Sequence, residues 1–154
     1  MLNEKIRIER ERVESKVNMY DNIESELLKY NYLLMPDFKI DNLDTKIMQE
    51  TNYVLFSARV VLEKILLQIG KKYSIENEKL SDLIYALYSK RILDASMNGY
   101  AHTIKAFGNR VAHPSLDLPI KFTSKDALLV LSVLVTFLNA LEAKNLLEDL
   151  KHVA

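Results

Sequence analysis

Apolar residues recur every three or four positions through most of the chain, which is the spacing that places side chains on one face of an α-helix. Few stretches alternate apolar and polar residues in the manner of a half-buried β-strand. Only three glycines and three prolines interrupt the 154 residues. The pattern therefore predicts an all-α protein with five helices.

The first two predicted helices cover the N-terminal half of the chain. The first runs over about residues 3–34 and ends before Pro36, because a proline cannot continue a helix. The second ends at Gly70, since glycine commonly follows the last helical turn. It is apolar on more than one face, so we expect it at the centre of the fold. Its start is marked by three candidate N-caps, Asp41, Asn42 and Asp44.

The third helix is predicted over about residues 76–90 and the last over about residues 124–150. Thr123, with an acidic residue three positions later, forms a capping-box pattern at the start of the last helix. Residues 127–141 are apolar nearly all round but too few to span a bilayer, which needs about 20. We expect this helix to lie in the core and to be shared with a second copy of the chain, which gives a homodimer.

The fourth predicted helix starts at Asp94 or Ser96 and leads into the sequence IKAFGNRVAHPS, residues 104–115. We expect it to end near Phe107, because Gly108 and Asn109 both tolerate left-handed backbone angles. Pro114 then favours an extended backbone at the preceding residue, and a loop is predicted over residues 113–122.

Asn109, Arg110 and His113 crowd into five positions of this sequence. In a metal-free ribonuclease, a histidine such as His113 takes a proton from a ribose 2′-hydroxyl. A cation such as Lys105 or Arg110 then stabilises the phosphorane charge, and the Asn109 amide orients the phosphate. The alternative is structural: His113 caps helix carbonyls, and Asn109 is a left-handed cap.

Arg59 and Glu63 lie one turn apart on the second predicted helix, amid apolar residues. They form either a solvent-facing pair, worth about 0.2–0.5 kcal/mol, or a polar pair that faces the His113 loop across the bundle. Residues 5–16, KIRIERERVESK, mix charges of both signs. This segment is either a solvated helix face or a coiled-coil-like surface for a protein partner.

Charge and composition narrow the classes of function. The chain has 21 basic and 21 acidic residues, which argues against a protein that coats nucleic acid by bulk charge but leaves room for a local basic patch. It has no cysteine and three widely spaced histidines, so no metal site is predicted. Phosphate-binding and dinucleotide fingerprints are missing, so no cofactor is expected. The charged N-terminal segment is unlike a signal peptide, and we expect a cytoplasmic location.

Three blocks of the sequence, taken in order, resemble the HEPN superfamily ("higher eukaryotes and prokaryotes nucleotide-binding"). They are SARVVLEKILLQIGKKY at residues 57–73, the segment at residues 79–115 with its Gly-Asn-x-x-Ala-His-Pro motif, and TSKDALLVLSVLVTFLNALEA at residues 123–143. The branch it resembles is a bacterial domain of unknown function that is often attached to restriction enzymes. The resemblance covers about residues 45–145, which would form the core bundle, and leaves the N-terminal helix, residues 1–35, outside it.

From the helix pattern we expect a single domain, residues 1–154, built as a four- to five-helix up-and-down bundle with a long N-terminal helix, and the resemblance likewise implies a four- or five-helix bundle. It also implies a dimer in many members, and active members are metal-independent endoribonucleases of toxin–antitoxin, CRISPR and phage-defence systems. Their signature places an arginine about five positions before the histidine. Here no arginine lies four to seven positions before His113, and Lys105 stands where the branch usually has arginine. Lysine keeps the charge but lacks the planar fork that suits phosphate.

Three functions follow as hypotheses. The first is a HEPN-like accessory or binding domain of a nucleic-acid-linked bacterial system, dimeric and not strongly catalytic, with RNA, a nucleotide or a protein bound at the His113 loop. The second is a metal-independent ribonuclease in which His113, Asn109 and Lys105 carry the chemistry. The third is a structural bundle whose N-terminal helix binds a protein partner.

Overall fold

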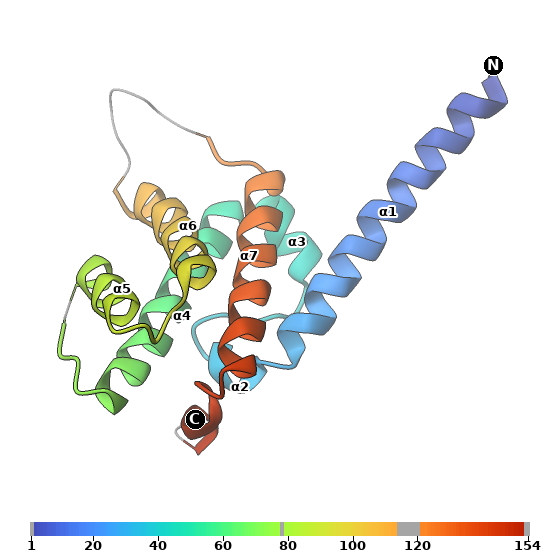
Figure 1. Ribbon diagram of the computed structural model, residues 1–154. Coiled ribbons are helices and arrows are strands. Elements are labelled where there is room, and N and C mark those ends of the chain that lie inside the picture. The colour runs from blue at the N-terminus through green and yellow to red at the C-terminus, as the bar shows by residue number, and fades with distance from the viewer. Residues whose placement is uncertain (1, 78, 114–120, 153–154) are drawn as a thin grey trace.

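All regular structure in the computed structural model, which describes residues 2–77, 79–113 and 121–152, is helical (Figure 1). The all-α prediction is therefore confirmed. The elements, in chain order, are α1 (Leu2–Leu28), α2 (Asn31–Leu34), α3 (Leu43–Gln49), α4 (Thr51–Lys72), α5 (Leu80–Ser89), α6 (Ala95–Ala112), α7 (Ser124–Ala143) and a 3-10 helix (Glu148–His152).

Helix α4 is the centre of the bundle, as its apolar character predicts. It packs against α6, α7, α3 and α5, and also contacts the short α2. Ten of its residues are buried, which is more than one helix face can supply. Helices α6 and α7 pack on α4 and on each other, so these three helices form the core (Figure 1).

Helix α7 is the one described helix that is long and apolar enough to cross a membrane by length and composition. Its apolar residues pack in the core, where eight of them are buried. Its exposed side carries the polar residues Ser132, Thr136 and Asn139 at helical spacing. The apolar run is thus accounted for by its place in the bundle.

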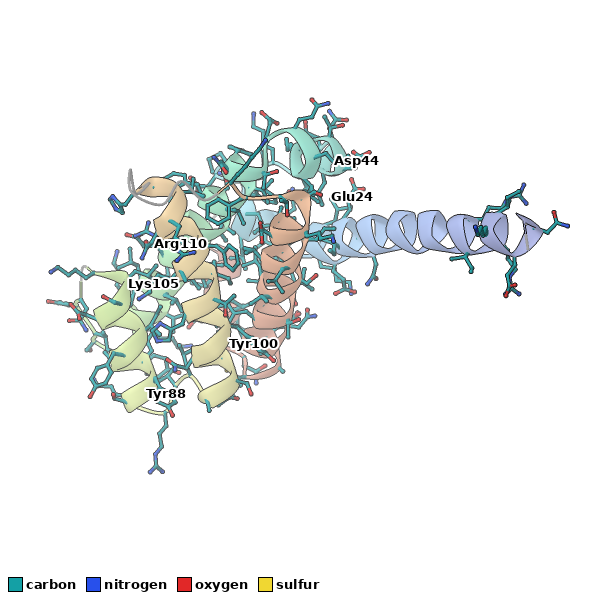
Figure 2. All side chains as sticks on the ribbon, turned by 90° about the horizontal axis from the view of Figure 1, so that it is seen from above. Glu24, Asp44, Tyr88, Tyr100, Lys105 and Arg110 are labelled. Carbon is teal, nitrogen blue, oxygen red and sulfur yellow. The ribbon has the colours of Figure 1, made fainter. Side chains whose placement is uncertain are left out.

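The first predicted helix is divided in two, and its N-terminal part projects away from the body of the bundle (Figures 1 and 2). Helix α1 ends at Leu28, and a turn at Tyr30 leads into α2. This turn buries Tyr30, whose hydroxyl donates a hydrogen bond to Glu142 Oε2 of α7 at 2.7 Å. A continuous helix over residues 3–34 was wrong because the chain bends back to bury this ring against α7.

The second predicted helix is also divided. Helix α3 follows Asn42, one of the expected N-caps, which adopts a left-handed conformation with φ 55°. A break at Glu50 separates α3 from α4. Gly70 does not end α4, which continues to Lys72, and Ser74 carries the left-handed angle instead. A Cβ at Gly70 would lie 3.0 Å from Leu83 Cδ1 of α5, so this glycine permits close helix packing.

The other predicted ends are correct in part. The carboxylate of Asp94 caps α6 by accepting from the Met97 N–H at 2.9 Å, and the Asp126 carboxylate accepts from the Thr123 N–H at 2.8 Å at the start of α7. Helix α5 starts only at Leu80. Helix α7 ends at Ala143, short of residue 150, because the chain turns at Asn145. This turn lets Leu146, Leu147 and Leu150 pack into the core.

The end predicted for the fourth helix was wrong. Helix α6 continues through Gly108 and Asn109 to Ala112, with His113 as its C-cap residue. Asn109 is not among the described residues with a left-handed backbone, so it is not a left-handed cap. Most of the predicted loop, residues 114–120, lies outside the described residues. Gly108 is buried because α6 crosses α4 there: a Cβ at Gly108 would lie 2.7 Å from Arg59 Cδ and still closer to Arg59 Cβ.

We expect Gly108→Ala to lower the free energy of unfolding by about 1–2 kcal/mol, because the strain of overpacking exceeds the gain in helix propensity. The matched control is Gly99→Ala in the same helix, where nothing lies within 4 Å of the added Cβ. That change should stabilise the protein by about 0.5–1 kcal/mol. Urea unfolding followed by circular dichroism measures both. Equal effects of the two substitutions would contradict the close approach of α4 and α6.

We expect Tyr30→Phe to lower the free energy of unfolding by about 1–2 kcal/mol, because it removes a hydrogen bond to a carboxylate and keeps the ring in place. Tyr85, which is 71% exposed on α5, provides the control. Tyr85→Phe should leave the unfolding midpoint unchanged in the same urea titration. If Tyr30→Phe leaves the free energy of unfolding unchanged, burial of the ring alone stabilises the turn between α1 and α2.

Candidate functional site

The candidate site forms where the middle of α4 meets the C-terminal half of α6. Arg59 of α4 donates from Nε to Asn109 Oδ1 of α6 at 2.6 Å. The same guanidinium donates from NH1 to Glu63 Oε2 at 3.3 Å. Arg59 and Glu63 form the expected i,i+4 pair, and Arg59 also contacts Asn109 of α6, so the pair is neither wholly solvent-facing nor directed at the His113 loop itself.

The guanidinium of Arg59 keeps donors for a further acceptor. It carries five N–H groups, and the two hydrogen bonds to Asn109 and Glu63 leave the others unpaired within the described part of the chain. The Arg59 side chain is 23% exposed, so these donors are reachable from solvent. A half-buried, oriented arginine of this kind is suited to bind a carboxylate or a phosphate.

Two of the sequence-predicted site residues, Lys105 and Asn109, form a row on α6, because they lie four positions apart and share one side of the helix. His113 follows four positions later as the C-cap residue, just outside the helix. Asn109 and Lys105 are half-buried and His113 is exposed. The structure thus brings Arg59, Glu63 and Asn109 into contact and places Lys105 and His113 one turn to either side of Asn109.

His102 extends this row by one more turn and was not among the predicted site residues. Partial burial and the nearby Lys105 ammonium lower the pKa of His102. The spacing of three between His102 and Lys105 was the signal in the sequence. Because a lowered pKa keeps the imidazole neutral, His102 can accept or donate a hydrogen bond at neutral pH.

Arg110 is exposed, and the face of α6 to which it belongs lies on the side of the bundle away from the projecting α1 (Figure 2). Helix α6 contains no aspartate or glutamate, whereas it carries Lys105 and Arg110. Neither cation forms an ion pair within the residues that the structure describes. A chain of zero net charge therefore has a locally basic helix, which attracts anions.

Two pairs of aromatic rings pack together, one of them on α6. Phe107 packs on Phe122, with ring centroids 5.9 Å apart, and Tyr53 of α4 stacks on Phe38 at 6.4 Å. Tyr53 remains 40% exposed. Neither pair could be predicted from the sequence, because its members are separated by 15 residues in each case and periodicity reports only local neighbours.

The chemistry available at the site is the binding of an anion. In the described parts of the chain, no group of three or more histidine, cysteine, aspartate or glutamate side chains is arranged to hold a metal ion. The His113 imidazole makes no hydrogen bond to another described residue, whereas a general base is normally oriented by a partner. Arg59 supplies positive charge at the Asn109 amide and is paired with the Glu63 carboxylate, and Lys105 lies one turn before Asn109 on α6.

Comparison with curated proteins and with solved structures finds no match. A family model described as "Domain of unknown function (DUF4145)" matches residues 44–151. The match covers more than half of the chain and includes α4, α5, α6 and α7 with every residue of the candidate site. The chain therefore belongs to the family described as Domain of unknown function (DUF4145).

Proposed function

We propose that this protein is a HEPN-like RNA-binding domain that serves as an accessory module of a bacterial restriction, phage-defence or toxin–antitoxin system. The observation that carries the proposal is the hydrogen bond from Arg59 to Asn109. It fixes a half-buried guanidinium beside a helix that has basic residues and no acidic ones. Such an arrangement suits the phosphates of a nucleic-acid strand, which dominate the affinity of its complexes.

The distribution of charge supports binding along α6 rather than coating by the whole surface. Several lysines elsewhere are paired with acidic residues, among them Lys64 with Asp37 and Lys144 with Asp94. Lys105 and Arg110 have no such partner within the described ranges. An unpaired cation on an acid-free helix gains more from a phosphate than a cation that must first break an ion pair.

A binding role is favoured over cleavage for two reasons. His113 is exposed and lacks an orienting hydrogen bond from the described residues, and no arginine lies four to seven positions before it, where the active HEPN signature has one; Lys105 stands where the branch that the chain resembles usually has arginine. A lysine binds phosphate as a point charge, without the bidentate fork that stabilises a phosphorane. Arg59 offers such a fork, but it is held to Glu63 as well as Asn109.

The expected homodimer, the protein partner of the N-terminal helix and the cytoplasmic location stay predictions. Leu129 of α7 is 50% exposed, and Ile6 and Ile8 of α1 are 46% and 45% exposed. These apolar side chains are candidate contacts for a second copy or another protein.

We expect Lys105→Gln and Arg110→Gln each to weaken binding of single-stranded RNA about fivefold at ~0.1 M salt, since each removes about one phosphate contact. Fluorescence anisotropy with a labelled 12-nucleotide RNA measures the affinity, and a salt titration should show a shallower slope. Lys71→Gln is the control, because Lys71 is an exposed lysine at the far end of α4. Equal losses in all three variants would place the RNA elsewhere or show that its binding is unspecific.

We expect the purified protein to bind RNA in EDTA without cutting it, because His113 lacks an oriented partner in the described structure. Denaturing gels of labelled RNA after prolonged incubation provide the measurement. Cleavage in EDTA that is lost in His113→Ala, with an unchanged melting temperature, would instead assign the metal-independent ribonuclease activity.

A further inference from the structure

A pocket of about 470 Å³ lies between the junction of α3 with α4 and the start of α7. Its size falls in the range of about 300–1,000 Å³ that is usual for small-molecule sites. Five residues of its lining are used below: Gln49, Asn52, Tyr53, Lys121 and Phe122. Neither Arg59, Glu63 nor Asn109 lines this pocket, so it is separate from the candidate site described above.

Both aromatic walls of the pocket are held by neighbouring rings. Tyr53 stacks on Phe38, which is 1% exposed, with an angle of 26° between the ring planes. Phe122 packs on Phe107 of α6. A flat ring that is held from one side and still 40% exposed gives a stacking surface without the entropy cost of ordering it.

The polar groups of the pocket match the edge of a nucleobase. Gln49 and Asn52 are exposed, and neither carboxamide is hydrogen-bonded within the described residues. Each carboxamide presents a donor beside an acceptor, which is the pattern that pairs with the edge of a base. Lys121 supplies a cation for a phosphate, and Glu50 is the acidic residue of the lining.

The pocket is continuous with the basic helix through the packed rings. Phe122 borders the pocket and contacts Phe107 of α6. Phe107 and Arg110 lie three positions apart on α6, so they are neighbours on one side of the helix. A strand with a phosphate at Arg110 therefore reaches the pocket over the Phe107–Phe122 contact. A single-stranded chain can turn one unpaired base out of its stack into such a site.

We propose that this pocket takes one unpaired nucleobase of a single-stranded RNA, which stacks on Tyr53 between the aromatic walls while Lys121 binds its phosphate. This inference rests on the proposed function, since α6 supplies the remaining phosphate contacts. It adds a site that recognises the base, whereas Lys105 and Arg110 recognise only the backbone.

The test uses two labelled 12-nucleotide RNAs in fluorescence anisotropy: an oligoadenylate and an otherwise identical oligomer in which every base is missing. Tyr53→Leu should weaken binding of oligoadenylate by at least about fivefold and leave binding of the abasic oligomer unchanged. Tyr53→Phe should restore the affinity, because the ring is kept. Tyr85→Leu, at an exposed tyrosine of α5, is the control and should change neither affinity.

Phe122→Leu is the second variant, since Tyr53→Leu also removes a contact to Phe38. Affinity for the base-containing RNA should again fall more than affinity for the abasic oligomer, and circular dichroism should show that the variant is folded at the assay temperature. If both leucine variants bind oligoadenylate like the wild type while Arg110→Gln binds it more weakly, the base pocket is overturned and the proposed function stands. Equal losses for both RNAs would also overturn the pocket. Wild-type protein that binds neither RNA would overturn both.

Discussion

The close approach of α4 and α6 at Gly108 is the constraint on which the site depends. Because residue 108 has no side chain, the stem of Arg59 lies directly against the backbone of α6. The guanidinium then reaches Asn109, the next residue of α6, and Glu63, one turn along α4. A larger residue at position 108 would separate the helices and move the arginine away from the amide that orients it.

The same contact places a polar cluster at the edge of an apolar core. Helices α4, α6 and α7 bury a continuous set of apolar side chains, and the cluster lies where α6 approaches its C-terminus. An arginine that is 23% exposed loses part of its hydration, and its two hydrogen bonds offset that cost. The partly exposed Arg59 guanidinium keeps N–H donors that are not used within the described residues. Because α6 has no acidic residue beside it, a ligand can bind this oriented guanidinium.

Much of the fold could be predicted because periodicity and capping are local. The all-α class, the Asp94 cap and the capping interaction of Asp126 follow from residues within one or two turns. The glycines show where local reasoning failed. Gly70 and Gly108 indicated helix ends, but both lie inside helices: a Cβ would be tight against Leu83 at Gly70, and α4 leaves no room for one at Gly108. A glycine required by packing and one required by backbone angle look the same in a sequence.

For the candidate site, the residue types are evident from the sequence, with Asn109, Arg110 and His113 within five positions. The sequence pattern did not predict that Asn109 shares α6 with Lys105, because Gly108 indicated a helix end. Packing between helices then brings Arg59 to Asn109 and places Tyr53 and Phe122 on one pocket. These relations join residues 50 or more positions apart. They depend on the register between packed helices, which is set by side-chain volumes. Local sequence patterns do not predict that register.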